Sequence, residues 1–236
     1  MTMKTLRVIR PGTIHYDEAF SLQLRLVEEV IRRGDGSLGY LLLLQHPPVI
    51  TIGRSGSRDN ILVGAEELQR RGIDVRESNR GGDVTYHARG QVVGYPIISL
   101  RPFGRDIHGY LRRLEGVIIA ALAGYGIRAT RIAGRTGVWV ARDEAAPRKI
   151  ASIGVAVRRW VAYHGFALNV TIDPREFEII RACGIEGVQM TSMERELGKP
   201  LDCDAVADTL CECFAGEFGF EVEPISPAAC AGEARK

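Results

Sequence analysis

Residues 149–170 read KIASIGVAVRRWVAYHGFALNV, and this stretch decides the fold class. Small, apolar and β-branched side chains dominate it, and such residues favour strands. Two strands are predicted within it, over 149–157 and 166–170. Lys149 stands at the head of the first strand, and His164 lies just before the second. The same stretch therefore predicts both a sheet and candidate polar groups on that sheet.

Outward from this stretch, apolar residues recur with helical spacing at both ends of the chain and once between them. Helices are predicted over 17–33, 62–71, 107–123 and 202–218, with Asp17 capping the first. Thr191 and Glu194 predict a capping box for a short helix that ends at Gly198. Further strands are predicted over 40–45, 49–53, 74–78, 91–100, 129–132, 137–141 and near 220–223. Because strands cluster between terminal helices, the sequence predicts an α+β fold in which helices flank a mixed sheet.

The composition is that of an ordinary globular protein, with 236 residues, 45% hydrophobic and 25% charged. No linker divides the chain, so one domain is predicted over 1–236, with a compact core over about 1–223. The Ala-, Pro- and Gly-rich residues from about 224 to 236 predict a flexible tail. No apolar stretch approaches the ~20 residues of a membrane span, and residues 1–10 lack the apolar core of a signal peptide. A cytoplasmic protein is predicted.

Charge is distributed unevenly along the chain. Residues 1–199 carry 29 Lys and Arg against 21 Asp and Glu, a net charge of +8, whereas residues 200–236 carry a net charge of −6. A basic body can attract an acidic protein or a phosphate-bearing ligand, but an ordinary solvated surface explains it equally well. Candidates for such attraction in predicted loops are Arg54, Arg58, Arg89 and Arg135. No nucleic-acid-binding motif is present, so nucleic acid is not predicted as a partner.

Lysine is rare in this chain: 27 of the 31 cationic residues are Arg, and the four lysines are Lys4, Lys149, Lys199 and Lys236. Arg cannot act as a base in a protein, because it keeps its proton at any physiological pH. Lysine amines can give up a proton when they are desolvated. Lys149 at the head of an apolar strand is therefore a candidate for proton transfer.

The five cysteines divide into an inert set and one candidate. Their odd number favours a reducing compartment. Cys211 and Cys213 lie two residues apart on a predicted helix, where they point about 200° away from each other, so a shared metal ion is not expected. Cys183 lies instead in a glycine-flanked turn, where a ligand can approach closely. From the residues alone, Cys183 is either an inert loop cysteine or a nucleophile.

Three segments carry the ingredients of covalent acyl transfer: Asn79–Gln91, Lys149–Val155 followed by Tyr163–Val170, and Ala182-Cys183-Gly184. A neutral lysine can take the proton of a thiol, and the resulting thiolate can attack an acyl carbonyl. The small residues Gly81, Gly82 and Gly154 would leave room for an apolar acyl chain to run along the backbone. Each segment alone is a weak signal.

Together these segments resemble the octanoyltransferases, also called lipoate–protein ligase B, from roughly Tyr16 to Phe220. The motifs that carry the resemblance are Gln45-His46-Pro47-Pro48-Val49, Thr51-Ile52-Gly53-Arg54, the Arg80–His87 block, Gly137-Val138-Trp139-Val140, Lys149–Gly154, His164–Val170 and Thr191-Ser192-Met193-Glu194. The resemblance implies the fold of biotin and lipoate protein ligases, which is similar to class II aminoacyl-tRNA synthetase cores.

The resemblance also implies an activity and a site. An octanoyl group would move from octanoyl-acyl carrier protein to a lysine of lipoyl domains, with no ATP, no cofactor and no metal. The implied acceptors are the lipoyl domains of 2-oxoacid dehydrogenase E2 subunits and the glycine cleavage H protein. The thioester cysteine falls on Cys183, and the lysine that activates its thiol falls on Lys149. The implied contacts to the acyl substrate are Arg80, Gly81, Gly82, Asp83, Val84, Thr85, Tyr86, His87, Ser152, Ile153, Gly154, Gly165, Phe166 and Ala167.

The sequence departs from the family pattern at two places. Ala88-Arg89 stand where the family usually has Gly-Pro, and Ala182 stands where Pro is common. Because Gly and Pro are missing there, the sequence does not determine the backbone conformation of the two loops.

Two other functions stay open. One is an ATP-dependent lipoate or biotin ligase of the same fold, but the glycine–arginine loop of biotin ligases is missing. The other is a non-catalytic binder of lipoyl domains or acyl carrier protein, but such a binder needs neither Cys183 nor Lys149.

Overall fold

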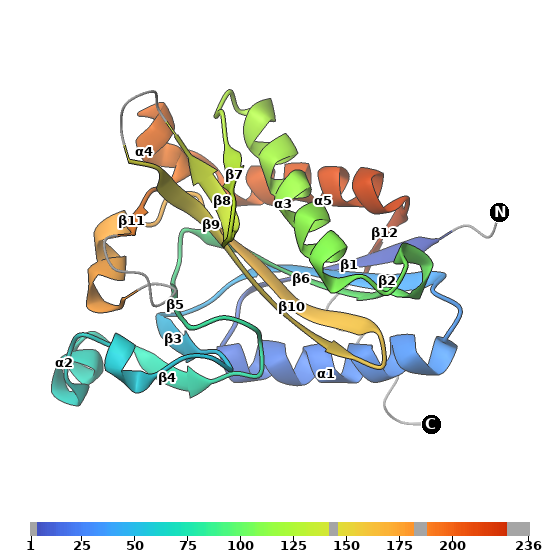
Figure 1. The fold of residues 1–236 in the computed structure, drawn as a ribbon, viewed down its shortest axis with the longest axis horizontal. Helices are drawn as coiled ribbons and strands as arrows, with labels where there is room; N and C mark the ends of the chain where they lie inside the picture. The colour runs from blue at the N-terminus through green and yellow to red at the C-terminus, as the bar shows by residue number, and fades with distance from the viewer. Residues whose placement is uncertain (1–3, 142–145, 182–187, 226–236) are drawn as a thin grey trace.

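The computed structural model describes residues 4–141, 146–181 and 188–225. Its strands are β1 (Thr5–Thr13), β2 (Leu38–Gln45), β3 (Val49–Ile52), β4 (Asp74–Glu77), β5 (Val84–His87), β6 (Gln91–Ser99), β7 (Thr130–Ile132), β8 (Arg135–Val140), β9 (Arg148–Arg158), β10 (Val161–Asn169), β11 (Gln189–Met190) and β12 (Glu221–Ile225). Nine of them form one sheet in the order β12-β1-β2-β6-β10-β9-β8-β7, with β11 paired to β9 (Figure 1).

The large sheet is mixed, as predicted. Strand β1 runs parallel to β2 and β12, and β11 runs parallel to β9, whereas the other pairings are antiparallel. The stretch 149–170 forms the β9–β10 hairpin, in which Gly154 lies opposite Gly165. Strand β10 begins at Val161, five residues before the predicted start, because the chain turns back at Arg159 and Trp160, both with positive φ.

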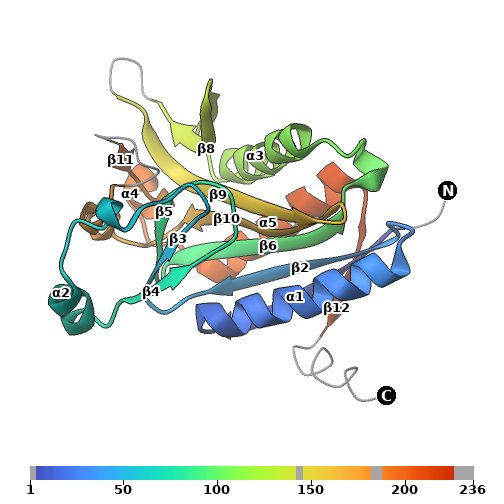
Figure 2. The same cartoon turned by 60° about the horizontal axis from the view of Figure 1, so that its bottom comes forward.

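Helices cover both faces of this sheet. They are α1 (Tyr16–Arg33), α2 (Ala65–Arg70), α3 (Ile107–Gly124), α4 (Met193–Leu197) and α5 (Cys203–Phe218), with 3₁₀ turns at Arg58–Asn60, Arg101–Phe103 and Pro174–Ile179. Figures 1 and 2 show α1 on one face and α3 with α5 on the other. Val27 and Val30 of α1 pack on the first face, while Leu114 of α3 and Phe214 of α5 pack on the second. None of the helices in the described ranges is long and apolar enough to cross a membrane.

A second sheet of three strands, in the order β4-β3-β5, lies beside one end of the large sheet. Strand β5 was not predicted, because it lies inside a segment whose glycines and polar residues indicated a loop. Val84 and Tyr86 of β5 are buried against Ile50 and Phe177 in a separate apolar cluster. Since β5 leads directly into β6, this small sheet fixes the segment that enters the centre of the large one.

Two predicted helix caps are wrong in detail. Helix α1 begins at Tyr16 after His15, and Asp17 lies in its first turn, where its carboxylate pairs with Arg76 at 2.8 Å. The capping box at α4 does not form. The Thr191 hydroxyl instead donates to Glu196 at 2.5 Å, because Arg148 holds that carboxylate nearby.

Three cysteines lie on α5, as predicted: Cys211 is buried, and Cys203 and Cys213 are half-buried. Among the described residues, no group of three His, Cys, Asp or Glu side chains could hold a metal ion. Strand β12 extends to Ile225, so it includes two residues that were predicted to begin the tail. Residues 226–236 lie outside the described part of the chain.

Candidate functional site

A cavity of about 450 Å³ lies where the β9–β10 hairpin meets the loop that follows β4. Lys149 lines it, and so do all predicted binding residues except Tyr86: Arg80, Gly81, Gly82, Asp83, Val84, Thr85, His87, Ser152, Ile153, Gly154, Gly165, Phe166 and Ala167. The structure therefore brings three separate sequence segments into one wall.

Tyr86 points away from the cavity because side chains alternate along a strand. Its ring packs against Phe177, and its hydroxyl donates to Glu176 at 2.7 Å. The predicted contact of Tyr86 with an acyl substrate is thus not supported by its position. Cys183 and Ala182 lie outside the described residues.

The loop after β4 is held by the buried side chain of Arg80. Its guanidinium donates to the Thr51 carbonyl at 2.6 Å and to the Thr51 hydroxyl at 2.8 Å. The Gly81 amide donates to the Val155 carbonyl at 2.8 Å, so the loop lies directly on β9. A Cβ atom at Gly154 would come within 2.8 Å of the Gly81 oxygen. The loop therefore lies close over Gly154, which also lines the cavity, and room there for an acyl chain stays a prediction.

Lys149 is the second residue of β9, and only 2% of its surface is exposed. Its side-chain nitrogen lies 5.4 Å from the centroid of the Trp139 ring. Its carbonyl accepts a hydrogen bond from the Thr191 amide at 2.9 Å. Sheet pairing on both sides of β9 thus fixes the backbone from which this amine reaches the cavity.

Three buried histidines, His46, His87 and His164, lie at or beside the cavity. The His46 ring contacts the His87 ring, and the Tyr95 ring contacts both His46 and His164. Burial lowers the pKa of His46 to about 4 and the pKa values of His87 and His164 to about 3. The positive charge of Arg80 lowers the pKa values of His87 and His164 further. All three imidazoles are therefore neutral at physiological pH, and they provide a polar but uncharged wall.

Two backbone carbonyls determine which nitrogen of His87 carries the proton. The Asn169 amide nitrogen donates to the Thr191 carbonyl at 2.9 Å, so the Asn169 side-chain oxygen must be the atom that faces Gln91. The Gln91 amide nitrogen donates to that oxygen and to the Tyr86 carbonyl. The Gln91 oxygen is left to face His87 Nδ1 at 3.0 Å. A side-chain amide oxygen can only accept, so His87 is protonated at Nδ1 and its Nε2 is an acceptor.

The same reasoning fixes His46. Its Nδ1 lies 2.8 Å from the Ile14 carbonyl and must donate to it. Its Nε2 lies 2.8 Å from the Tyr95 hydroxyl and therefore accepts that proton. The Tyr95 oxygen then offers only lone pairs to other groups.

The turn that departs from the family pattern is closed by hydrogen bonds from its backbone. Ala88 is buried and Arg89 is exposed, and the backbone amide of Gln91 donates to the Ala88 carbonyl. The Gly90 amide donates to the Gln45 side chain at 2.8 Å. Gln91 consequently reaches His87 although Gly and Pro are missing from the turn.

The four arginines proposed to attract an acidic partner are all exposed. Arg135 alone among them lines the cavity, and its guanidinium lies 5.8 Å from the Trp139 ring centroid. Sequence reasoning did not place Tyr16, Tyr95 or Trp139 at the cavity, although all three line it. Tyr16 opens α1 and Tyr95 lies on β6, and only tertiary packing brings such distant aromatic residues to the segments carrying the motifs.

Comparison with known proteins places the fold. The sequence matches the family described as "Lipoyl protein ligase A/B catalytic domain" over residues 15–215. A bipartite lipoate protein ligase from Thermoplasma acidophilum has a TM-score of 0.71 at 19% identity, covering 98% of this chain and 91% of that one. A biotin protein ligase from Aquifex aeolicus has a TM-score of 0.51 at 13% identity, covering 92% and 71%. The fold is thus that of a lipoyl protein ligase catalytic domain, as predicted.

Sequence relatives define the class more narrowly. An octanoyltransferase of Geotalea uraniireducens strain Rf4 is 47% identical over 216 residues, which cover 90% of this chain and 94% of the relative. An octanoyltransferase of Solibacter usitatus strain Ellin6076 is 46% identical over 220 residues, covering 93% and 96%. The chain belongs to the octanoyltransferase family, and it is a transferase of protein lipoylation.

The histidine assignments can be tested by NMR. We expect His46 and His87 to remain neutral Nδ1–H tautomers from about pH 8 to about pH 5, because their pKa values are about 4 and about 3. Imidazole ¹⁵N spectra would check this, with the exposed rings of His15 and His108 as internal references. An Nε2–H tautomer at His87, or its protonation above pH 5, would contradict the assignment.

The same pKa shifts set the sign of a pH effect on stability. In the unfolded chain His46, His87 and His164 have the ordinary pKa of ~6.5 and take up protons below that pH, whereas in the folded chain they stay neutral until the pH is much lower. The free energy of unfolding should therefore fall as the pH drops from ~6.5 towards 4, by up to ~1.4 kcal/mol per pH unit for each histidine.

Proposed function

We propose that this octanoyltransferase works through a covalent octanoyl-Cys183 intermediate, with Lys149 as the group that moves protons. The observation that carries the proposal is the burial of a lysine amine, 2% exposed, in the wall of the cavity. A lysine that served only to add positive charge would stand in solvent, as an arginine does at most other cationic positions of this chain.

The position of Lys149 in the sheet supports this role. In the parallel β11–β9 pairing, Met190 lies beside Lys149. Cys183 lies seven residues before Met190 in the sequence, so the segment that carries the proposed nucleophile leads directly to the strand next to the lysine. Arg181, two residues on the other side of Cys183, is tied by its amide to the Asn60 carbonyl at 2.8 Å.

The first half-reaction balances with these groups alone. The neutral amine of Lys149 takes the proton of the Cys183 thiol, and the thiolate attacks the thioester carbonyl of octanoyl-acyl carrier protein. A bond forms between Cys183 sulfur and the acyl carbon, and the carrier's carbon–sulfur bond breaks. The carrier thiolate leaves with the proton from Lys149, which returns the lysine to its neutral form.

The second half-reaction repeats the same proton transfers on the acceptor. The neutral amine of a lipoyl-domain lysine attacks the acyl carbon, a carbon–nitrogen bond forms, and the bond to Cys183 sulfur breaks. Lys149 takes the proton that the attacking nitrogen loses and gives it to the Cys183 thiolate. No oxidant, reductant or nucleotide is consumed.

The cavity supports an acyl chain as the bound group. Its volume of about 450 Å³ lies within the usual range for small-ligand sites. Ile153, Phe166 and Ala167 give it an apolar wall, and the histidines beside them carry no charge at physiological pH. Along these apolar and uncharged side chains, an acyl chain can bind without stripping water from an ion.

The proposed donor is octanoyl-acyl carrier protein, and the proposed acceptors are lipoyl domains of 2-oxoacid dehydrogenase E2 subunits and the glycine cleavage H protein. The exposed Arg135 at the cavity supports an acidic carrier as donor. A cytoplasmic location, where such partners would be met, remains a prediction. An ATP-dependent ligase is not favoured, because the relatives with high identity are octanoyltransferases and the ligases share only the fold.

The covalent intermediate can be observed directly. Incubation with octanoyl-acyl carrier protein, without ATP or acceptor, should add one octanoyl mass to the intact protein, and peptide mapping should place it on Cys183. Cys183→Ser should fold but lose this addition, because a hydroxyl is much harder to deprotonate than a thiol. Cys203→Ser provides a matched control on α5 and should keep it. Near-normal turnover by Cys183→Ser would remove this cysteine from the mechanism.

The role of Lys149 is tested by an arginine. If Lys149 moves protons, Lys149→Arg and Lys149→Ala should both lose two orders of magnitude or more in kcat/KM, a size typical of a lost general base. Arginine keeps the charge but cannot release its proton. Lys199→Arg, in an exposed turn after α4, is the matched control. Correctly folded Lys149→Arg within tenfold of wild type would reduce the lysine to an electrostatic role.

A further inference from the structure

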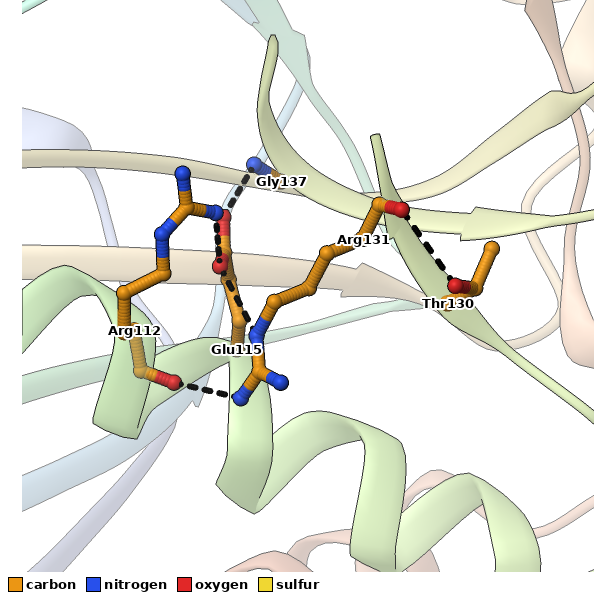
Figure 3. Close-up of polar contacts among 5 residues, drawn as sticks. All are labelled: Arg112, Glu115, Thr130, Arg131 and Gly137. Atoms are coloured by element: carbon orange, nitrogen blue, oxygen red, sulfur yellow. Dashed lines mark hydrogen bonds and ion pairs between the residues drawn. The ribbon is translucent and has the colours of Figure 1, made fainter. Parts of the chain in front are cut away.

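A buried carboxylate lies behind the cavity, on the far side of β8. The side chain of Glu115 in α3 is only 1% exposed, whereas the side chains of its two arginine partners are about half exposed. Arg112 donates to it at 2.7 Å and Arg131 at 3.2 Å, and its second oxygen accepts the Gly137 amide at 3.1 Å (Figure 3). Burying a carboxylate is costly unless each lone pair is used, so this arrangement calls for a reason.

Gly137 is the link from this carboxylate to the site. Its φ is +122°, a conformation that side-chain-bearing residues rarely adopt. A Cβ atom there would come within 2.7 Å of the Lys149 Cε and 3.3 Å of its Nζ. The end of the Lys149 side chain therefore lies directly against the backbone of Gly137, and Glu115 holds that backbone from behind.

Among the described strand pairs, none includes Gly137 itself, although Arg135 and Val138 on either side of it are paired. Pairing between β8 and β9 shifts register between Val138 and Trp139, and the pairs run from Val138 onward. Pairing between β7 and β8 is irregular over the same part of the strand. The buried Gly137 amide thus depends on Glu115, and Arg131 ties the neighbouring strand β7 to α3 through the Arg112 carbonyl at 2.8 Å.

We propose that Glu115 is a positioning residue for octanoyl transfer: by holding Gly137, it places the Lys149 amine at the cavity. The proposal rests on the catalytic role of Lys149 proposed above. The bond between Glu115 and Gly137 has the positioning role, whereas the arginines make the buried carboxylate tolerable and Arg131 also ties β7 to α3.

Two substitutions separate the pairing of Glu115 with the arginines from its hydrogen bond to the Gly137 amide. Glu115→Gln keeps the shape, but the single amide oxygen faces two guanidinium groups and is drawn to them, which leaves an N–H against the Gly137 N–H. Glu115→Asp keeps the charge for the arginines but shortens the side chain by one methylene. Both should lower kcat/KM by about tenfold to a hundredfold, the cost of displacing a reacting group by roughly 1 Å. Arg112→Ala is the matched control, because it removes an ion pair of the same carboxylate and leaves the bond to Gly137.

The rarity of lysine supplies a readout that does not depend on activity. With ¹³C-labelled lysine the protein has only four side chains in the spectrum, and Lys149→Arg identifies the signal of Lys149. That signal should be shifted by the Trp139 ring, whose centroid lies 5.4 Å from the amine. In Glu115→Gln and Glu115→Asp the shift should move towards the value of exposed lysines, and in Arg112→Ala it should stay, even if thermal stability falls.

The outcomes are distinct. The proposal is supported if either Glu115 variant loses both the ring-shifted Lys149 signal and activity. Arg112→Ala must then keep the Lys149 signal where it is and keep kcat/KM within threefold of wild type. A folded Glu115 variant that keeps the Lys149 shift overturns it, and so does an Arg112→Ala protein that loses the shift, since general loosening of the β7–β8 hairpin would then be the cause. An active Lys149→Ala protein would instead overturn the proposed function, and the NMR shift would still decide whether Glu115 places the lysine.

Discussion

Burying a lysine amine removes it from water, and the protein must replace the contacts that water made. Lys149 is almost fully buried, with the Trp139 ring near its amine and the backbone of Gly137 against its last carbons. Much of the surrounding architecture follows from this requirement. The register shift between β8 and β9 and the buried carboxylate of Glu115 both lie at the point where room for this side chain is needed.

The histidines at the cavity beside this amine are polar groups that carry no charge at physiological pH. Gln91 and Asn169 connect the His87 ring to the Thr191 carbonyl, and the Thr191 amide in turn binds the Lys149 carbonyl. One buried chain of hydrogen bonds therefore determines which nitrogen of His87 is protonated and also holds the backbone of Lys149 in place. Such a hydrogen-bonded network makes the wall rigid and specifies a single arrangement of these groups.

The fold class and most of the cavity wall could be predicted, because the relevant residues occur in contiguous motifs on β5, β9 and β10. What escaped prediction is non-local. Nothing in the sequence around Glu115 indicates that its carboxylate meets Gly137, and the β9 register shift depends on pairing between strands. Strand β5 was hidden by its glycine-rich flank, and the box at Thr191 failed because Glu196 attracted its hydroxyl. The approach of the Gly81 loop to Gly154 is non-local as well, since it joins the segment after β4 to β9.

In the proposed mechanism the acyl group is bound covalently to the protein before it reaches the acceptor. The most direct measurement isolates the octanoylated protein, free of carrier and nucleotide, and mixes it rapidly with a purified lipoyl domain. The account predicts that the octanoyl mass leaves the enzyme and appears on the domain lysine in a single turnover, at a rate no slower than kcat. An octanoylated protein that stays loaded beside its acceptor, or that releases its acyl group only when ATP is added, would contradict it.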